Sequence, residues 1–167
     1  IVDKEGKYNG WQMNPDELQN RDIKFFDEVF SQISKNYNID LDRIYPVGHS
    51  NGSRFVNVLW KMRPEKFAAF VIVAGPGGNW LKFAPQKSVW ISFGKNDKIV
   101  PYKIQKFSSK QYLKFFEVQE STAQTNGEIT SYETSENKEI IIEDRNAGHE
   151  FPQNSIPKMV EFLKRNH

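Results

Sequence analysis

The chain has 167 residues, of which 38% are hydrophobic and 26% charged, values typical of one globular domain that can bury a core. Its 23 basic and 21 acidic residues give a net charge of only +2, and no basic cluster marks a nucleic-acid-binding surface. Cysteine is absent, which excludes disulfides, thiolate chemistry and cysteine-ligated zinc.

The first half of the chain predicts helices and strands in alternation. Residues 22–37 place apolar side chains at helical spacing, which is typical of an amphipathic helix. Residues 44–47 form a short apolar run that predicts a strand, although Pro46 cannot donate a ladder hydrogen bond. Residues 54–62 carry apolar side chains on one helical face, and residues 67–74 predict a strand covered on both faces.

The second half continues this alternation. Residues 88–93 predict another buried strand, residues 127–134 and 138–143 predict two more, and residues 109–116 and 156–165 predict helices. Strands that alternate with helices indicate an α/β fold with a mostly parallel sheet and helices on both faces. Such a sheet places its ligand site at the carboxyl ends of the strands.

A candidate nucleophile lies between the first predicted strand and the second predicted helix. The run Gly48-His49-Ser50-Asn51-Gly52 has the form of a nucleophile elbow, a sharp strand-to-helix turn that exposes a serine hydroxyl. The backbone N–H of Asn51, the residue after the nucleophile, is the expected donor to an oxyanion. The competing interpretation is a glycine-rich turn in which Ser50 only caps the helix.

Only three histidines are available as the base that a serine nucleophile needs. His49 lies inside the elbow, where its side chain cannot readily reach the adjacent hydroxyl. His167 is the last residue of the sequence, and chain ends tend to fray. His149 lies in a loop just beyond the strand predicted at 138–143, where a base is expected, although a surface histidine without a task is the alternative.

Asp97, which follows the strand predicted at 88–93, is the expected acid that orients the base. The order Ser50, Asp97, His149 is that of α/β-hydrolases. Asp144 is the competing carboxylate, but it lies only five positions before His149 and is expected to be still on the strand. Asp97 has its own alternative interpretation, a turn residue among Gly, Asn and Lys.

Three motifs occur in order along the chain: residues 40–52 with the elbow, residues 97–102 around the acid, and residues 148–152 around the histidine. Together they resemble the polyhydroxybutyrate depolymerase and feruloyl esterase family of α/β-hydrolases, and the resemblance runs from about Trp11 to the end. It implies the α/β-hydrolase fold. It also implies a secreted or periplasmic esterase that acts on polyesters or on feruloyl and acetyl groups of plant polysaccharides.

The chain departs from this family's pattern in two respects. Phe151 stands where the family often has Trp, Ala147 where a second Gly is usual, and Phe93 where His is frequent. The family's opening strands, and the loop with the second oxyanion donor, precede the region matched here. We therefore expect residues 1–167 to form a single catalytic domain that is the C-terminal portion of a larger hydrolase, with its N-terminal strands missing.

Three aromatic residues are candidates for substrate binding. Trp80 and Phe83 follow a glycine-rich loop and could line an acyl or aryl pocket, or simply pack over the end of the sheet. Phe151 lies two residues after His149. The glycine-rich loop lacks the Lys-Ser/Thr ending of a phosphate-binding loop, and no histidines are paired at helical spacing, so no cofactor or metal is predicted. The lysines of residues 103–114 suggest a solvated helix face.

These observations predict a serine esterase in which Ser50 attacks an ester carbonyl, His149 takes its proton and Asp97 orients the imidazole. The substrate is an ester, polymeric or polysaccharide-linked ones included, and no nucleic acid is expected as a partner. No apolar run approaches the ~20 residues of a membrane span. The alternatives are a peptidase on the same fold, a non-catalytic relative that binds carbohydrate or polymer, and an inactive fragment.

Overall fold

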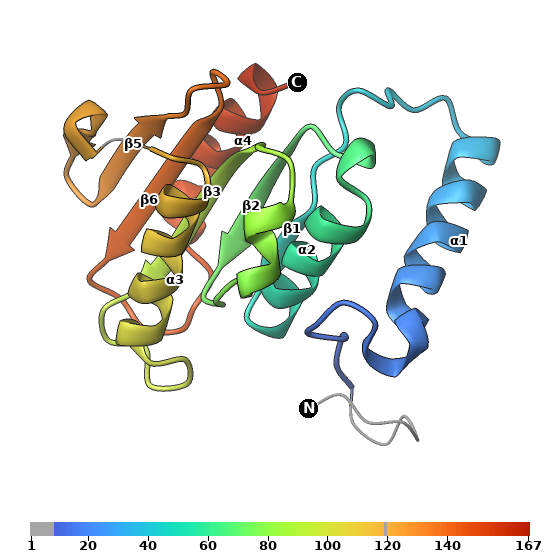
Figure 1. The fold of residues 1–167 in the computed structure, drawn as a ribbon, viewed down its shortest axis with the longest axis horizontal. Helices are drawn as coiled ribbons and strands as arrows, with labels where there is room; N and C mark the ends of the chain where they lie inside the picture. Colours follow the sequence, from blue (N-terminus) through green and yellow to red (C-terminus); the bar gives the residue numbers. More distant parts are fainter. Residues whose placement is uncertain (1–8, 119) are drawn as a thin grey trace.

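The computed structural model describes residues 9–118 and 120–167, which form a six-stranded sheet with helices on both sides (Figure 1). The strand order along the sheet is β1-β2-β3-β6-β5-β4. Four strands are parallel to one another: β1 (Val47–His49), β2 (Ala69–Val73), β3 (Ser88–Gly94) and β6 (Glu139–Arg145). Two strands extend the sheet in antiparallel pairing: β5 (Ile129–Glu133) and β4 (Gln124–Asn126).

Helices cover both faces of this sheet. Helices α2 (Asn51–Met62) and α3 (Tyr102–Phe115) lie in front of it in Figure 1, and α4 (Ile156–Arg165) lies behind it. Helix α1 (Arg21–Asn36) lies at one end of the molecule, beyond α2. The described residues also form short 3-10 helices: η1 (Glu17–Asn20), η2 (Pro64–Lys66), η3 (Asn79–Phe83), η4 (Glu120–Thr122) and η5 (Gln153–Ser155). The predicted fold class, a mostly parallel sheet with helices on both faces, is confirmed.

The core is divided between the two faces because side chains alternate along each strand. On β2, Phe70 points into the larger cluster under α2 and α3, where its ring stacks on Trp60 with 4.6 Å between the ring centroids. Val71 and Val73 point into the second cluster, which packs against Phe162 of α4. Every residue of β2 is buried, which explains its nearly continuous apolar sequence.

Most of the predicted elements lie within a few residues of their expected bounds, but three features differ. The strand predicted at 44–47 is β1 at Val47–His49, although the carbonyl of Pro46 already accepts a hydrogen bond from Val71 N–H at 3.1 Å. Helix α3 begins at Tyr102, and the prediction started only at residue 109 because lysines interrupt the apolar pattern of the first turns. Strand β4 is short, polar and exposed, and no pattern predicted it.

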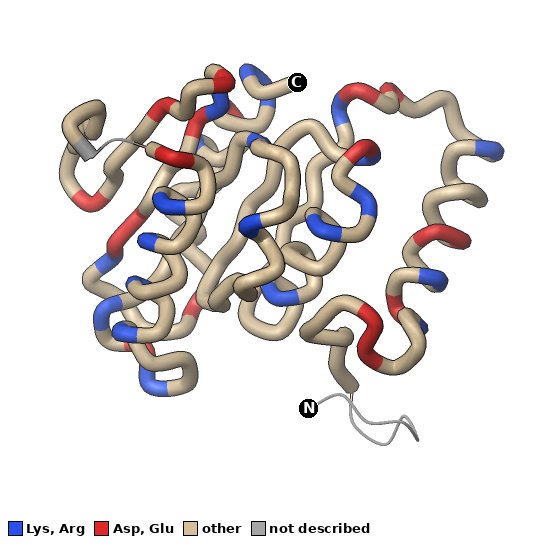
Figure 2. The backbone as a smooth tube through the Cα atoms, in the orientation of Figure 1, with Lys and Arg blue, Asp and Glu red and all other residues tan. Residues whose placement is uncertain are grey.

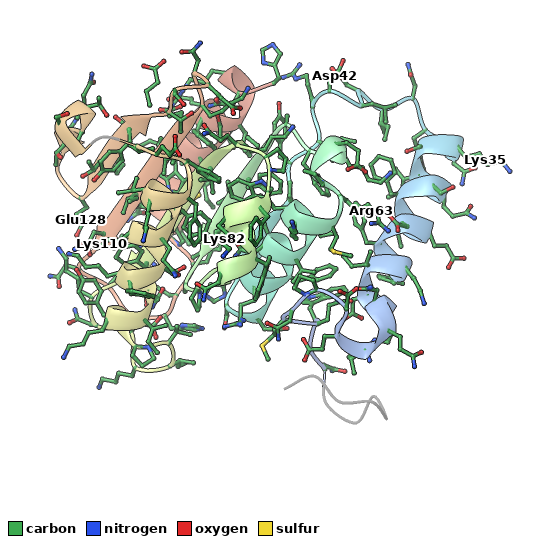
Figure 3. The ribbon with its side chains drawn as sticks, viewed as in Figure 1. Lys35, Asp42, Arg63, Lys82, Lys110 and Glu128 are labelled. Carbon is green, nitrogen blue, oxygen red and sulfur yellow. The ribbon has the colours of Figure 1, made fainter. Side chains whose placement is uncertain are left out.

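The first half of helix α1 attaches it to the rest of the molecule, through a buried side chain and an ion pair. Ile23 is 1% exposed, and the Asp27 carboxylate accepts two hydrogen bonds from Arg63 Nε, at 2.9 and 3.1 Å. Arg63 follows the end of α2 and lies in the space between the two helices (Figure 3). Further along α1, Ile33 is 44% exposed, and Val47 on β1 is 50% exposed. Among the described residues, β1 pairs with β2 alone, so this end of the sheet is uncovered.

Lysines are concentrated in the middle of the sequence. Residues 75–116 contain eight lysines and one acid, Asp97, whereas the rest of the chain holds 15 basic and 20 acidic residues. Figure 2 shows blue segments along α3 and η3 as a result. All four lysines of α3 are exposed, as expected for a solvated helix face.

The junction between β1 and α2 requires a glycine at position 48. A Cβ atom on Gly48 would lie 2.7 Å from Ser53 Cα and closer still to the carbonyl oxygen of Gly52. Gly52, the other glycine of the elbow, has no atom within 4 Å of the position of an added Cβ. Strand and helix can therefore approach this closely only because Gly48 has no side chain.

We predict that Gly48→Ala destabilises the protein by about 1–3 kcal/mol, because the new methyl group forces α2 away from β1. Gly52→Ala is the matched control and should change the free energy of unfolding by less than about 1 kcal/mol. Urea denaturation of both variants measures these free energies. Equal stability of the two variants would contradict the close contact at Gly48.

Candidate active site

Three predicted site residues follow parallel strands at the same edge of the sheet. Ser50 comes directly after β1, Asp97 lies in the loop after β3, and His149 lies in the loop after β6. Because β1, β2, β3 and β6 are parallel, their carboxyl ends meet at one edge. The topology thus brings residues from three distant parts of the sequence to one side of the molecule.

Ser50 occupies a strained turn. Its backbone has φ 56° and ψ −118°, a conformation that costs a residue other than glycine about 1–3 kcal/mol. Ser50 N–H donates to the carbonyl of Val73 at 2.8 Å, and the Ser50 carbonyl accepts from Ser53 Oγ at 2.7 Å. The strand–turn–helix setting predicted for the elbow is confirmed. Within the described part of the chain, the half-buried Ser50 side chain makes no hydrogen bond.

Asp97 and His149 form a hydrogen-bonded pair. His149 Nδ1 lies 2.8 Å from Asp97 Oδ2, and the Asp97 side chain is almost completely buried. Asp97 Oδ1 accepts from the N–H groups of Ile99 and Val100, both at 2.8 Å, and Oδ2 accepts from Gln105 Nε2 at 2.9 Å. Burial alone would raise the pKa of Asp97, but the hydrogen bonds outweigh it and hold this pKa below its usual value. The carboxylate is therefore ionised and fixed in place.

The bond to Asp97 determines what the His149 ring can do. A carboxylate accepts hydrogen bonds, so Nδ1 carries the proton and the neutral ring keeps Nε2 as its basic nitrogen. No hydrogen bond to His149 Nε2 occurs among residues 9–118 and 120–167. Bonds between a nucleophile and its base are often loose before substrate binds.

The competing candidates make other contacts. Asp144 accepts a hydrogen bond from Tyr102 Oη at 2.9 Å and lies 3.4 Å from Lys106 Nζ. His167 lies at the end of the chain, where Nδ1 is 3.0 Å from the carbonyl of Lys164. The structure brings neither of them to Ser50.

Asn51 is attached by its side chain to a distant segment. Asn51 Oδ1 accepts from Trp11 N–H at 2.7 Å, and Asn51 Nδ2 donates to the Trp11 carbonyl at 3.1 Å. The Trp11 indole stacks on Phe55 of α2, with 4.9 Å between ring centroids and 9° between ring planes. Asn51 is the first residue of α2, so its N–H has no partner within the helix and lies at the positive end of the helix dipole.

A buried glutamine continues this attachment towards α1. Gln12 is fully buried, and its Oε1 accepts from the N–H groups of Asp22 and Ile23, at 3.2 and 3.3 Å. In return, Gln12 N–H donates to Asp22 Oδ2 at 2.6 Å. The sequence did not predict the contacts of Asn51 and Gln12, since Trp11 stood out only as the place where the family resemblance begins.

The three candidate substrate-binding aromatic residues lie in different surroundings. Phe151 lies in the His149 loop and is half-buried, and its ring centroid is 6.2 Å from that of His49. The Trp80 ring covers Gly78 and packs against the larger core cluster. Phe83 is 70% exposed, and Lys61, near the far end of α2 from Ser50, lies 5.6 Å from its ring centroid. The structure therefore brings Phe151 to the site and leaves Phe83 away from Ser50.

The described residues contain neither a cluster of potential metal ligands nor a membrane-spanning helix. No group of three or more histidine, aspartate or glutamate side chains there could hold a metal ion. No helix in residues 9–118 and 120–167 has the length and apolar character needed to cross a bilayer.

Proteins described as esterases are among those that resemble this chain. No protein-family model matches the chain. A curated protein described as "Probable acetylxylan esterase A", from Aspergillus flavus, is 37% identical over 60 residues, which are 35% of this chain and 20% of that protein. The chain thus matches only about a fifth of the length of this curated relative.

Two solved structures share most of the present fold. The acetyl xylan esterase from Aspergillus awamori has a TM-score of 0.62 at 17% identity, covering 84% of this chain and 66% of that one. The Bacillus cereus carboxylesterase has a TM-score of 0.63 at 16% identity, covering 96% and 68%. At these identities the likeness concerns the fold. With the strand order and the elbow described above, it shows that the chain has the α/β-hydrolase fold.

Proposed function

We propose that this chain is the catalytic part of a serine esterase that hydrolyses carboxylic esters through an acyl-enzyme. The observation that carries the proposal is the Asp97–His149 hydrogen bond, formed at the sheet edge where the strained turn presents Ser50. A buried, ionised carboxylate on the Nδ1 side of an imidazole is the arrangement that makes Nε2 an effective base.

The geometry supports the following sequence of steps. Ser50 Oγ attacks the ester carbonyl while His149 Nε2 takes its proton, and Asp97 stabilises the imidazolium that forms. The alcohol leaves with the proton from His149, and a water molecule activated by the same nitrogen then hydrolyses the acyl-enzyme. Asn51 N–H donates to the oxyanion, a contribution of about 2.7–4 kcal/mol in enzymes of this kind.

The substrate class follows from two kinds of likeness. The motifs of the elbow, the acid loop and the histidine loop resemble polyester depolymerases and feruloyl esterases, whereas the comparisons give acetyl xylan esterases and carboxylesterases. We therefore propose small acyl esters of polysaccharides as the first substrates to test, and feruloyl esters and polyesters next. Secretion or export to the periplasm belongs to the same proposal, as does a single catalytic domain.

Phe151 and Trp80 are the proposed aromatic residues of the acyl pocket. Phe151 belongs to the histidine loop and lies near His49, and Trp80 lies on the turn that follows β2, the strand next to the elbow. Phe83 is the weakest member of the predicted set because it lies towards the other end of α2.

We predict that a fluorophosphonate probe labels the wild-type protein on Ser50 and does not label Ser50→Ala. The variant should also lose ester hydrolysis by about 10⁵–10⁶-fold in kcat, because the nucleophile is gone. Ser135→Ala, at an exposed serine remote from the site, is the matched control and should behave as wild type. Folded wild-type protein that takes no label would support the non-catalytic alternative instead.

A panel of p-nitrophenyl esters and peptide amides separates the esterase from the peptidase alternative. We expect acetyl and other short-chain esters to be cleaved and the peptide amides to remain intact. Faster cleavage of the amides than of the esters would make the protein a peptidase on this fold.

Asp97→Asn should lower kcat by on the order of 10⁴-fold, because an amide can no longer hold the correct tautomer of His149. Asp144→Asn is the control and should leave kcat nearly unchanged.

The lowered pKa of Asp97 adds a prediction about how the stability of the protein depends on pH. This carboxylate stabilises the folded state above the usual aspartate pKa, and the contribution is lost as the pH falls through the lowered pKa. The stability difference between wild type and Asp97→Asn, measured by denaturation at several pH values, should therefore shrink from pH 7 to pH 3.

A further inference from the structure

His49 is a half-buried side chain at the end of β1 to which the mechanism above gives no role. It points towards the histidine loop. Its Nε2 lies 2.5 Å from the carbonyl oxygen of His149, and the centroids of the two imidazole rings are 4.9 Å apart at an interplanar angle of 48°. The residue immediately before the nucleophile is thus in contact with the residue proposed as its base.

This contact joins two parts of the sheet that the topology keeps apart. Strands β1 and β6 are separated by β2 and β3, which at ~4.8 Å per strand places them about 14 Å from each other. To bring His149 to the elbow, the loop at residues 146–152 has to cross the ends of the strands between them. Its position therefore depends on what holds it along the way.

On the β3 side, the loop is held by several contacts. Asn96 N–H donates to the Ala147 carbonyl at 2.9 Å, and Asp97 binds the His149 ring at 2.8 Å. A Cβ atom on Gly94 would overlap with the carbonyl oxygens of Ala147 and Gly148, so the loop lies directly on the end of β3. These contacts all lie on the β3 side of His149, so the side that faces His49 has to be fixed by something else.

On the β1 side, the hydrogen bond from His49 is the only one that joins residues 47–53 to residues 146–152 within the described chain. The acceptor is a carbonyl oxygen, so His49 must carry its proton on Nε2. The neighbouring rings also limit the rotation of the His149 side chain. His149 is thereby held at two points, its Nδ1 by Asp97 and its backbone by His49.

We propose that His49 is a positioning residue that fixes His149 opposite Ser50 through its Nε2–H bond to the His149 carbonyl. The inference rests on the proposed esterase function, because its effect is on the transfer of the Ser50 proton. A displacement of about 1 Å in a catalytic group lowers rates by on the order of 10²-fold. Loss of this bond should therefore act on kcat far more than on KM.

Three variants test the proposal. His49→Gln places an amide N–H at nearly the position of the imidazole Nε2–H, whereas His49→Asn has the same amide on a side chain that is too short to reach. His49→Leu removes the donor altogether. We expect His49→Asn and His49→Leu to lower kcat, and the rate of fluorophosphonate labelling, by about 10- to 100-fold with KM within about twofold of wild type. His49→Gln should retain most of both rates.

Wild-type kcat in all three variants would overturn the proposal, and so would equal losses in His49→Gln and His49→Asn. Thermal unfolding shows whether each variant is folded, and the comparison of His49→Gln with His49→Asn keeps the test valid if His49→Leu does not fold.

The proton NMR signal of His149 Nδ1–H at low field gives a readout without substrate. It should stay sharp in His49→Gln and broaden in His49→Asn, and an unchanged signal in His49→Asn would also overturn the proposal. Wild-type protein without esterase activity would instead contradict the proposed function, while this signal still tests the role of His49.

Discussion

At Gly48 the backbone of β1 lies so close to the first turn of α2 that no side chain fits between them. This contact makes the turn at Ser50 sharp. The sharp turn then determines the backbone contacts of Ser50 and the position of Asn51 at the start of α2. Ser50 is held in its strained conformation by the Val73 carbonyl on one side and by Ser53 on the other. The same turn makes Asn51 the first residue of α2, so that its N–H is free of helix hydrogen bonds and can serve as the proposed oxyanion donor.

Asp97 and His149, the proposed acid and base, depend on a different part of the sheet, the neighbouring strands β3 and β6. Their parallel pairing places the two loops side by side, so that the carboxylate of one meets the imidazole of the other. Four hydrogen bonds to Asp97 outweigh the cost of burying its charge, which keeps it ionised. The candidate site thus combines a rigid Asp97–His149 pair that follows inner strands with Ser50, the proposed nucleophile, directly after β1 at an edge of the described sheet.

Sequence patterns predicted much of this arrangement. The strands that precede the Asp97 loop and His149 both appear as apolar runs, and parallel strands bring their ends together. Asp97, which follows its strand, is therefore the expected partner of His149 rather than Asp144, which is expected to be still on the strand. The contacts of His49 and Asn51 could not be predicted. They join residues 100 and 40 positions apart, and they depend on the path of a loop and of an N-terminal segment that no periodic pattern specifies. Helix α1 shows the same limit, since its spacing predicts an amphipathic helix but not that Ile33 remains exposed.

Among the described residues β1 has a single pairing, which has a consequence for how Ser50 separates from the other two proposed site residues. A strand with one neighbour is held by fewer ladder hydrogen bonds than β3, which pairs on both sides, so local opening at β1 requires less free energy than global unfolding. Such opening carries Ser50 away from His149 while Asp97 and His149 stay together on the inner strands. The esterase activity proposed above should therefore be lost reversibly on heating at temperatures where the rest of the sheet is still folded, and amide hydrogens of residues 47–50 should exchange before those of β3.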